Sequence, residues 1–387
     1  MKRKSRLKRF ARIIAGQSPP SAQVVDHDEH ALSFLQGNAE FTGTSPVPVK
    51  ACDTAPKRAR AGDILLSVRA PVGALNIADQ SYGIGRGLCA IRSICADQRF
   101  LWWALQDSVD DLQSRATGST YEAVSIEDVA DTLIPTPPLT IQRAIADYLD
   151  TETGRIDALI TKKRRMIQLL EERWMALAES VLCRFEAVPL KRYVTKIGSG
   201  STPRGGADVY VSSGPVFLRS QNIRGGVIDL SDVVFIDRLA QDQLRRALVR
   251  PGDVLLNITG GSIGRAAVMD RSDIQAYVSQ HVCIVRSVPG VDAWVLWAEL
   301  SSQSVQEQIA VVQVGGNREG LNFEQVGNLL VRIPSIDQSQ AIAQVLATGL
   351  QVSKRTTETL GSQIELLVER RRALITSAVT GELGVVV

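Results

Sequence analysis

Apolar residues recur in alternating steps of four and three along the middle of the chain. This spacing is typical of a helix that buries one stripe against a partner helix. It predicts a helix of roughly 40 residues and about 60 Å, at 1.5 Å per residue. Gly154 interrupts the row, and a kink or break is predicted there because glycine destabilises a helix interior by about 1 kcal/mol. The row comprises Ile145, Leu149, Ile156, Ile160, Ile167, Leu170, Trp174, Leu177 and Val181.

A second row of the same kind lies near the C-terminus. Three polar side chains, Ser353, Thr357 and Arg371, weaken it. A seam this long must face a partner, and the simplest partner for each predicted helix is the other one. The second row comprises Ile342, Leu346, Leu360, Ile364, Leu367, Leu374 and Ala378.

Outside these rows the apolar runs are short. Runs at 63–68, 216–219, 233–236 and 282–285 lie between clusters of Gly, Pro, Asn and Ser, which is typical of strands. The sequence therefore predicts an α+β fold of two strand-rich globules joined by helices. The expected boundaries are 1–136 for the first globule, 137–185 for the first helix, 186–333 for the second globule and 334–387 for the second helix with the tail.

The chain is an internal repeat. The tripeptide at 144–146, Ala-Ile-Ala, returns at 341–343, and the segment Gly-Asp-Ile-Leu-Leu at 62–66 returns as Gly-Asp-Val-Leu-Leu at 252–256. The offset grows from 183 residues near the start of each half to 197 at the helices, where it stays fixed. A repeat of this length makes half of the chain the architectural unit. We expect the two halves to be related by a pseudo-two-fold.

Length and composition bound the class of protein. A chain of 387 residues, 44% of them hydrophobic, can bury two separate cores. No uninterrupted apolar stretch approaches 18 residues, and the basic N-terminus lacks a secretory pattern, so no membrane association is expected. Five cysteines without a Cys-x-x-Cys pair fit a reducing cytoplasm and give no metal signature.

Charge is unevenly distributed although the net charge is only +3. Basic residues crowd the first twelve positions, which favours either an arm that contacts a polyanion or an ordinary solvated terminus. The basic runs at 162–165 and 370–372 on the predicted helices are interpreted as solvated faces.

Catalytic motifs are mostly absent. The chain contains no phosphate-binding loop of the Walker type and no His-Glu-x-x-His metal motif. The Gly-x-Ser-x-Gly pattern at 260–264 could form a hydrolase elbow, yet the repeat pairs Ser262 with Pro71, which cannot act as a nucleophile. The glycine pattern at 83–87 is interpreted as a turn. We expect neither a catalytic site nor a bound cofactor or metal.

Several segments carry a resemblance to a known family. They are Gly-Ser-Gly-Ser-Thr-Pro at 198–203, Pro-Gly-Asp-Val-Leu-Leu at 251–256, the proline turn with Gln and Ile-Ala at 134–146, and the closing segment at 373–381. In this order, and repeated, they resemble the specificity subunit of type I restriction-modification systems. The second proline turn at 333–338 and the start of the first half match less well.

The resemblance implies a non-catalytic DNA-recognition subunit. Each strand-rich module would be a target-recognition domain that contacts one half of a split, asymmetric double-stranded DNA site. The two helices would form an antiparallel coiled coil that separates the modules and docks two methyltransferase (modification) subunits, which restriction translocase-nuclease subunits would join. The alternative is a self-standing tandem DNA-binding or scaffold protein without a modification partner.

DNA contacts are expected from polar and basic residues in the loops that break the strand-like runs, since base edges are recognised by hydrogen-bond donors and acceptors. The alternative for each is ordinary turn chemistry. The tryptophans at 102, 103, 294 and 297 are interpreted as core residues. The candidate contacts are Arg69, Arg86, Thr120, Arg219, Gln221, Asn222, Asn257, Gln280, His281, Asn317 and Arg318.

Overall fold

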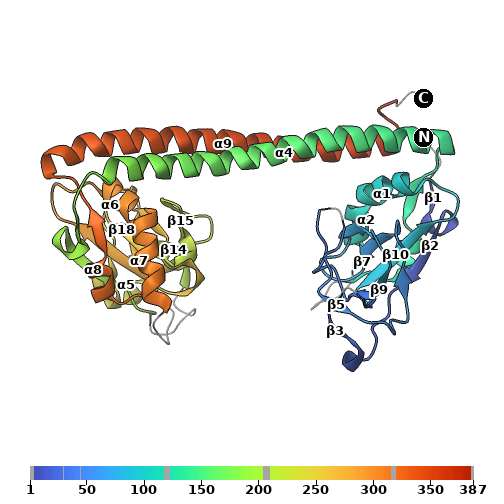
Figure 1. Cartoon of the computed structure of the whole chain (residues 1–387), viewed down its shortest axis with the longest axis horizontal. Coiled ribbons are helices and arrows are strands. Elements are labelled where there is room, and N and C mark those ends of the chain that lie inside the picture. The colour runs from blue at the N-terminus through green and yellow to red at the C-terminus, as the bar shows by residue number, and fades with distance from the viewer. Residues whose placement is uncertain are drawn as a thin grey trace. The chain divides into compact units, whose positions relative to one another are not determined.

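The computed structural model describes residues 4–28, 30–43, 45–116, 123–203, 210–314 and 320–384. It divides into two compact units (Figure 1). Unit 1 comprises residues 1–163 and 362–387, and unit 2 comprises residues 164–361. Each unit contains one strand-rich domain together with one half of each of the two long helices, α4 (Leu139–Leu182) and α9 (Ile336–Thr380).

Unit 1 is built on a four-stranded antiparallel sheet in the order β2-β10-β7-β8, the frame sheet of this unit. A smaller sheet, β3-β5-β4-β9-β6, adds a second core. The strands are β1 (Lys4–Arg6), β2 (Ala11–Ala15), β3 (Val25–Asp26), β4 (Ser33–Leu35), β5 (Lys50–Ala51), β6 (Arg58–Ala59), β7 (Ile64–Ser67), β8 (Leu75–Ile77), β9 (Tyr82–Ile84), β10 (Leu88–Ser93) and β11 (Leu133–Pro135), and the short helices are α1 (Gln98–Asp107), α2 (Val109–Ser114) and α3 (Ile126–Ala130).

Unit 2 repeats the frame sheet in the order β13-β21-β18-β19. Its second sheet differs, since only three strands pair, in the order β17-β14-β20. The strands are β12 (Ala187–Pro189), β13 (Val194–Ser199), β14 (Tyr210–Leu218), β15 (Ile223–Arg224), β16 (Val227–Ile228), β17 (Val234–Ile236), β18 (Val254–Asn257), β19 (Ala266–Val268), β20 (Ala276–Val278), β21 (Val282–Ser287) and β22 (Leu330–Arg332), and the helices are α5 (Arg238–Gln243), α6 (Ala293–Leu300), α7 (Gln303–Val314) and α8 (Phe323–Asn328).

A buried ion pair marks the repeat at atomic detail. In unit 1, Asp63 accepts hydrogen bonds from the Arg92 guanidinium at 2.7 and 2.6 Å, and in unit 2 Asp253 accepts the same bonds from Arg286 at 2.7 and 2.8 Å. Each aspartate follows a glycine at positive φ, +85° at Gly62 and +84° at Gly252. Since the turn and the ion pair recur with the same partners, the predicted internal repeat is confirmed.

The long helices pack against each other inside each unit. In unit 1 the Arg371 guanidinium of α9 lies 3.0 Å from the Asp157 carboxylate of α4, and in unit 2 the Trp174 indole donates to the Leu346 carbonyl at 3.2 Å. Partners from the later part of one helix meet the earlier part of the other, so the pairing is antiparallel. The predicted α+β architecture with two long antiparallel helices is confirmed.

Two details of the predicted helix are wrong. Helix α4 continues through Gly154 without a break, because the neighbouring Thr153 is buried and its hydroxyl donates to the Leu149 carbonyl at 2.6 Å. Packing of this turn outweighs the intrinsic cost of the glycine. Leu177 is 38% exposed, whereas Trp174, Ala178 and Leu182 are buried, so the buried stripe moves by one position where α4 also covers the domain of unit 2.

The basic N-terminus is not a free arm from residue 4 onward. Lys4–Arg6 pairs with Leu133–Pro135 as β1 with β11, and the Lys8 ammonium lies 2.7 Å from the Asp131 carboxylate. The hydrogen bond from Lys8 lowers the pKa of Asp131. The polyanion-binding arm is therefore corrected: these cations belong to the domain, because a strand far along the sequence pairs with them.

Among the described residues, no helix is both long and apolar enough to cross a membrane. The tryptophan prediction agrees with the burial of the side chains: Trp103 and Trp297 are buried, and Trp102 and Trp294 pack against the same cores.

Candidate nucleic-acid interface

The frame sheet of unit 1 ends in two loops that present arginines. Arg69 follows β7, and Arg86 lies between β9 and β10. Both side chains are exposed, and both line one hollow of about 250 Å³. The Ser67 hydroxyl donates to the Arg69 carbonyl at 2.7 Å and so turns the chain directly after the strand. We call Arg69 and Arg86 the loop edge of unit 1.

Glycines allow this edge to form. A Cβ added at Gly16 would lie 2.1 Å from the Gly85 carbonyl oxygen, so only glycine lets the end of β2 pass so close to the β9–β10 loop. Gly85 and Gly87 are buried, whereas Arg86 between them is exposed. The glycine pattern at 83–87 is thus a tight loop that presents one cation, as the turn interpretation predicted.

The same place in unit 2 carries different side chains. Thr259 follows β18, and Gln280 and His281 lie between β20 and β21. Thr259 pairs through its hydroxyl with the His281 Nδ1 at 2.5 Å, and the Thr202 hydroxyl donates to the Gln280 carbonyl oxygen. Gln280 and His281 are exposed. We call Thr259, Gln280 and His281 the loop edge of unit 2.

Backbone pairing shows that the two edges are equivalent. Arg69 forms an isolated β-bridge with Ala123, and Thr259 forms one with Gly320. These residues are related by the same offsets as the strands before them, 190 for the first position and 197 for the second. Arg86 matches Gln280 at the offset of 194 that also relates β10 to β21. Thr259 was not among the predicted contacts, although adding the local offset to Arg69 identifies it.

Two predicted contacts lie in a separate loop of unit 2. Arg219 follows β14, and its guanidinium donates to the Asp232 carbonyl at 3.1 Å. The Gln221 amide donates to the Asp232 carboxylate at 2.5 Å. Both side chains are thus held by one aspartate and are not part of the loop edge.

Asn222 and Asn257 require a correction. Both are buried, with exposures of 1% and 0%. The Asn222 amide donates to the Asp229 and Asp232 carbonyls at 3.1 and 2.9 Å, and the Asn257 amide donates to the Ser220 carbonyl at 2.9 Å. In this conformation neither side chain can reach a base, because each is used to hold loop backbone. Sequence alone could not separate this role from an exposed one.

The remaining predicted contacts, Thr120, Asn317 and Arg318, lie outside the described residues. Their segments adjoin Ala123 and Gly320, the residues that bridge to the two loop edges.

The ion pairs hold the strands that lead to the loop edges. Asp63 and Asp253 are 2% and 1% exposed. The hydrogen bond to Asp63 raises the pKa of Arg92, and the one to Asp253 raises the pKa of Arg286. Each arginine therefore stays charged and fixes the start of β7 or β18, at whose far end Arg69 or Thr259 follows.

Nothing in the geometry of Ser262 suits a hydrolase. It lies in a three-residue 3-10 helix, Gly260–Ser262, and its hydroxyl accepts a hydrogen bond from the Asn257 amide at 3.0 Å. A nucleophile elbow needs a strand that runs into a full helix. Within the described ranges, no group of His, Cys, Asp and Glu has the arrangement of a metal site.

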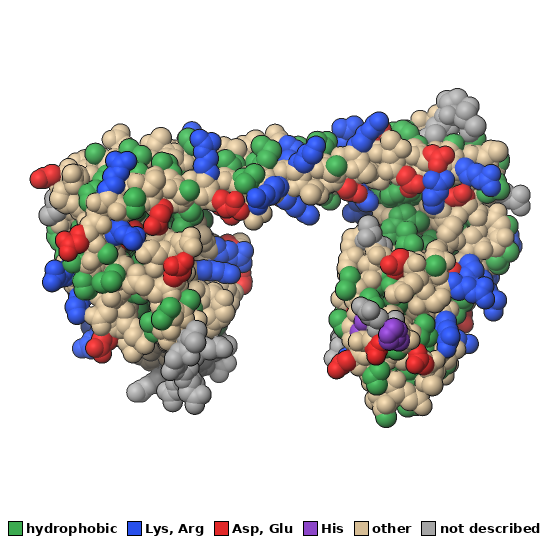
Figure 2. All heavy atoms as spheres, in the orientation of Figure 1, with side chains coloured by type: hydrophobic (Ala, Val, Ile, Leu, Met, Phe, Trp, Pro, Cys, Tyr) green, Lys and Arg blue, Asp and Glu red, His purple; other side chains and the backbone are tan. Residues whose placement is uncertain are grey.

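Charge does not gather into one patch on the face shown in Figure 2. Basic and acidic side chains are interspersed over that face of each unit. Specific contacts at the loop edges, and not a broad basic surface, distinguish the two units.

Comparison with known proteins gives one consistent family. Residues 5–169 match the family model of the type I restriction modification DNA specificity domain. A protein of Methanocaldococcus jannaschii described as the MjaX type I restriction enzyme specificity subunit is 38% identical over 166 residues, 42% of this chain. The type I restriction enzyme EcoBI specificity subunit of Escherichia coli is 25% identical over 320 residues, 74% of this chain. The alignments span 38% and 66% of these relatives' own lengths.

A solved structure has the same fold. It was determined for the complex assembly and conformational transition of the type I R-M system, and its chain aligns with 97% coverage of both chains, a TM-score of 0.66 and 16% identity. The sequence match of the first half, together with the repeated frame of the second half, extends the likeness over both units.

Proposed function

Because the chain belongs to the family of type I restriction-modification specificity subunits, we propose that it recognises a bipartite, asymmetric double-stranded DNA sequence. The domain of each unit contacts one half-site through its loop edge. The base pairs between the half-sites are not contacted by either edge.

One observation carries this proposal. The two units share a frame sheet, an ion pair and a bridge to the loop edge, yet they place two arginines at one edge and Thr, Gln and His at the other. A common frame with different donors and acceptors at the same position is what recognition of two unlike half-sites requires.

The side chains suggest the kind of base that each edge contacts. An arginine can donate two hydrogen bonds to the O6 and N7 of guanine, whereas a glutamine amide matches the N6 and N7 of adenine. We therefore infer that the half-site of unit 1 is richer in guanine contacts. Arg219 and Gln221 are assigned to positioning on the phosphate backbone, since Asp232 holds them outside the edge.

The chain works as one part of a complex. Two methyltransferase subunits dock on α4 and α9, and restriction translocase-nuclease subunits join them; all act in the cytoplasm. The specificity subunit itself contributes recognition and no chemistry. Purified alone, it is expected neither to methylate nor to cleave DNA, and methyl transfer by the isolated chain would refute this assignment.

The test is selection of DNA from a randomised pool by the assembled complex. We expect two conserved blocks of different sequence, separated by a fixed number of unconserved positions. A single block, or two copies of one block, would contradict the proposal. Binding of such a bipartite site by the chain in the absence of any modification subunit would favour the self-standing tandem DNA-binding protein instead.

A further inference from the structure

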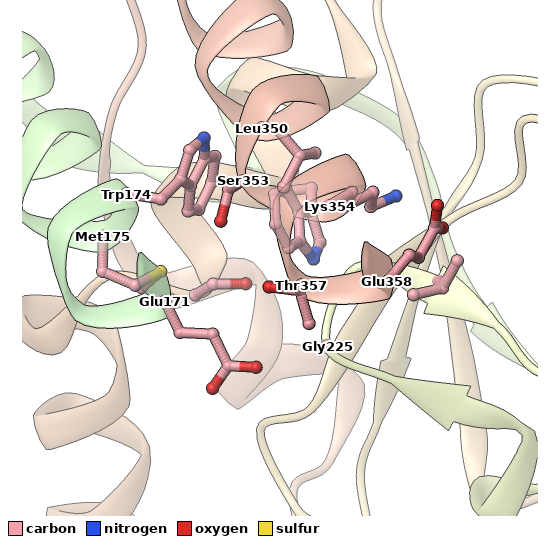
Figure 3. Close-up of a pocket in the computed structure, with 12 residues that line it drawn as sticks. Glu171, Trp174, Met175, Gly225, Leu350, Ser353, Lys354, Thr357 and Glu358 are labelled. Atoms are coloured by element: carbon pink, nitrogen blue, oxygen red, sulfur yellow. The ribbon is translucent and has the colours of Figure 1, made fainter. Parts of the chain in front are cut away.

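A hollow of about 480 Å³ lies between the long helices and the domain inside unit 2 (Figure 3). Trp174 and Met175 of α4, Leu350 of α9 and Trp297 of α6 form its apolar wall. The two indoles stack at an angle, with ring centroids 4.8 Å apart. Native cores are packed without voids of this size, so the hollow is a departure that needs a cause.

The cause is two residues of α9. Ser353 and Thr357 line the hollow, and they occupy positions of the 4-3 row that an apolar side chain would fill. At the offset of 197 residues, the matching positions in α4 are Ile156 and Ile160. Both isoleucines are buried, with exposures of 5% and 6%. The sequence therefore leaves space in one copy of the helix where the other copy is filled.

The equivalent place in unit 1 is also closed by charge. Arg371 matches Trp174 at the same offset. Its guanidinium lies 3.0 Å from the Asp157 carboxylate, donates to the Gln106 side chain at 3.3 Å and covers the Trp103 ring at 5.7 Å. The hollow thus belongs to unit 2 only.

The polar groups of the hollow are not used internally. Elsewhere on α9, Thr348, Thr356 and Thr359 donate their hydroxyls to carbonyls one turn earlier. Among the described residues, the Ser353 and Thr357 side chains make no such bond. At the rim, Glu171 and Glu358 have no cation within 4 Å in the described part of the chain. Buried or half-buried polar groups without partners are unfavourable unless a ligand supplies them.

The surroundings match the centre of a protein interface. Val227, which lines the hollow, is 45% exposed, and Val352 beside Ser353 is 60% exposed. An apolar depression inside a charged rim is the anatomy of the pockets that receive anchor side chains. The two rim carboxylates favour a basic residue next to such an anchor.

We propose that this hollow receives a bulky apolar anchor side chain, flanked by Lys or Arg, from a methyltransferase subunit docked on the helices. The two docking positions are then not equivalent, since unit 1 has no matching hollow. This inference rests on the proposed function, which supplies the partner.

The test compares binding of the methyltransferase subunit to the full chain and to variants, by titration calorimetry and native mass spectrometry. Ser353→Ile with Thr357→Ile fills the hollow with the residues of the other copy. Thr359→Ile is the matched control, because it makes the same change at an exposed position of α9 outside the hollow. Ser353→Val is a smaller filling variant that keeps the test valid if the double variant misfolds.

We expect the wild type to bind two methyltransferase subunits in two steps of unequal affinity. The filled variant should lose about tenfold or more in one step and nothing in the other, a change of about 1.4 kcal/mol for each factor of ten. The control should behave as the wild type. If filling raises the melting temperature and leaves both steps unchanged, the hollow is a packing defect and the inference fails. If the wild type binds no methyltransferase subunit, the proposed function itself fails.

Discussion

The two units differ at their loop edges and second sheets far more than at their frames. The order of the frame strands, the Gly-Asp turn and the buried ion pair recur with the same partners. The loop edges share backbone bridges but not side chains, and the smaller sheets differ in strand number. The comparison teaches that stability and recognition reside in separate parts of each unit. One part can therefore be changed without the other.

The largest effect is expected from the shared ion pair. Asp253→Ala leaves the Arg286 charge half-buried without its carboxylate, which should lower the free energy of unfolding of unit 2 by about 3 kcal/mol. Asp63→Ala should do the same in unit 1. The matched control is Asp273→Ala, since Asp273 pairs with Arg271 at the surface and such pairs contribute about 0 to 1 kcal/mol. Denaturant unfolding of the variants measures all three. Equal losses for Asp253 and Asp273 would mean that burial is not what makes the frame pair important.

A glycine breaks the comparison in the other direction, because its role exists in unit 2 only. Gly226 has a φ of +83°, and a Cβ there would lie 2.3 Å from the Trp297 ring. Gly226→Ala should cost about 2 to 3 kcal/mol through strain and overpacking. Gly225→Ala is the control, since Gly225 has a φ of +49° and open space around it, so its cost should stay near 1 kcal/mol. Thermal unfolding distinguishes them, and identical costs would exclude the clash with Trp297.

The buried carboxyl of Glu299 should make unit 2, and not unit 1, sensitive to pH. Burial raises the pKa of Glu299 to about 7, more than the hydrogen bond from the Arg332 amide and the Arg332 charge lower it, and nearby Glu179 adds to the rise. The matching position in unit 1 is Ala104, which carries no charge.

The sign follows from proton binding. Between the ordinary carboxyl pKa of 4.5 and about 7, the folded state holds more protons than the unfolded state, so stability falls as the pH rises through this window. The loss should be about 1 to 2 kcal/mol. Hydrogen exchange of unit 2 at pH 5 and pH 8 measures it. Glu299→Gln should remove the dependence, whereas Glu307→Gln, at an exposed position of α7, should keep it; a dependence that survives Glu299→Gln has another source.

Repetition explains how much could be predicted from the sequence. The helices, the strand runs and the repeated frame follow from periodicity and from the offsets, because these patterns depend on near neighbours and on equivalent segments. The N-terminal arm was wrong because β1 pairs with residues 133–135, a contact that no local pattern encodes. Asn222 and Asn257 were misplaced for the same reason, since their carbonyl partners come from loops whose path only the fold determines.

The most direct test of the central claim exchanges the side chains of one edge for those of the other. Arg69→Thr with Arg86→Gln places the unit 2 residues on the unit 1 frame, at exposed positions whose replacement should cost little stability. Sequences selected from a randomised pool by the assembled complex are then compared with those of the wild type. The account predicts that one half-site changes, with a loss of about 1 to 3 kcal/mol for its original bases, while the other half-site and the gap stay the same. A change in both half-sites, or in neither, would contradict it.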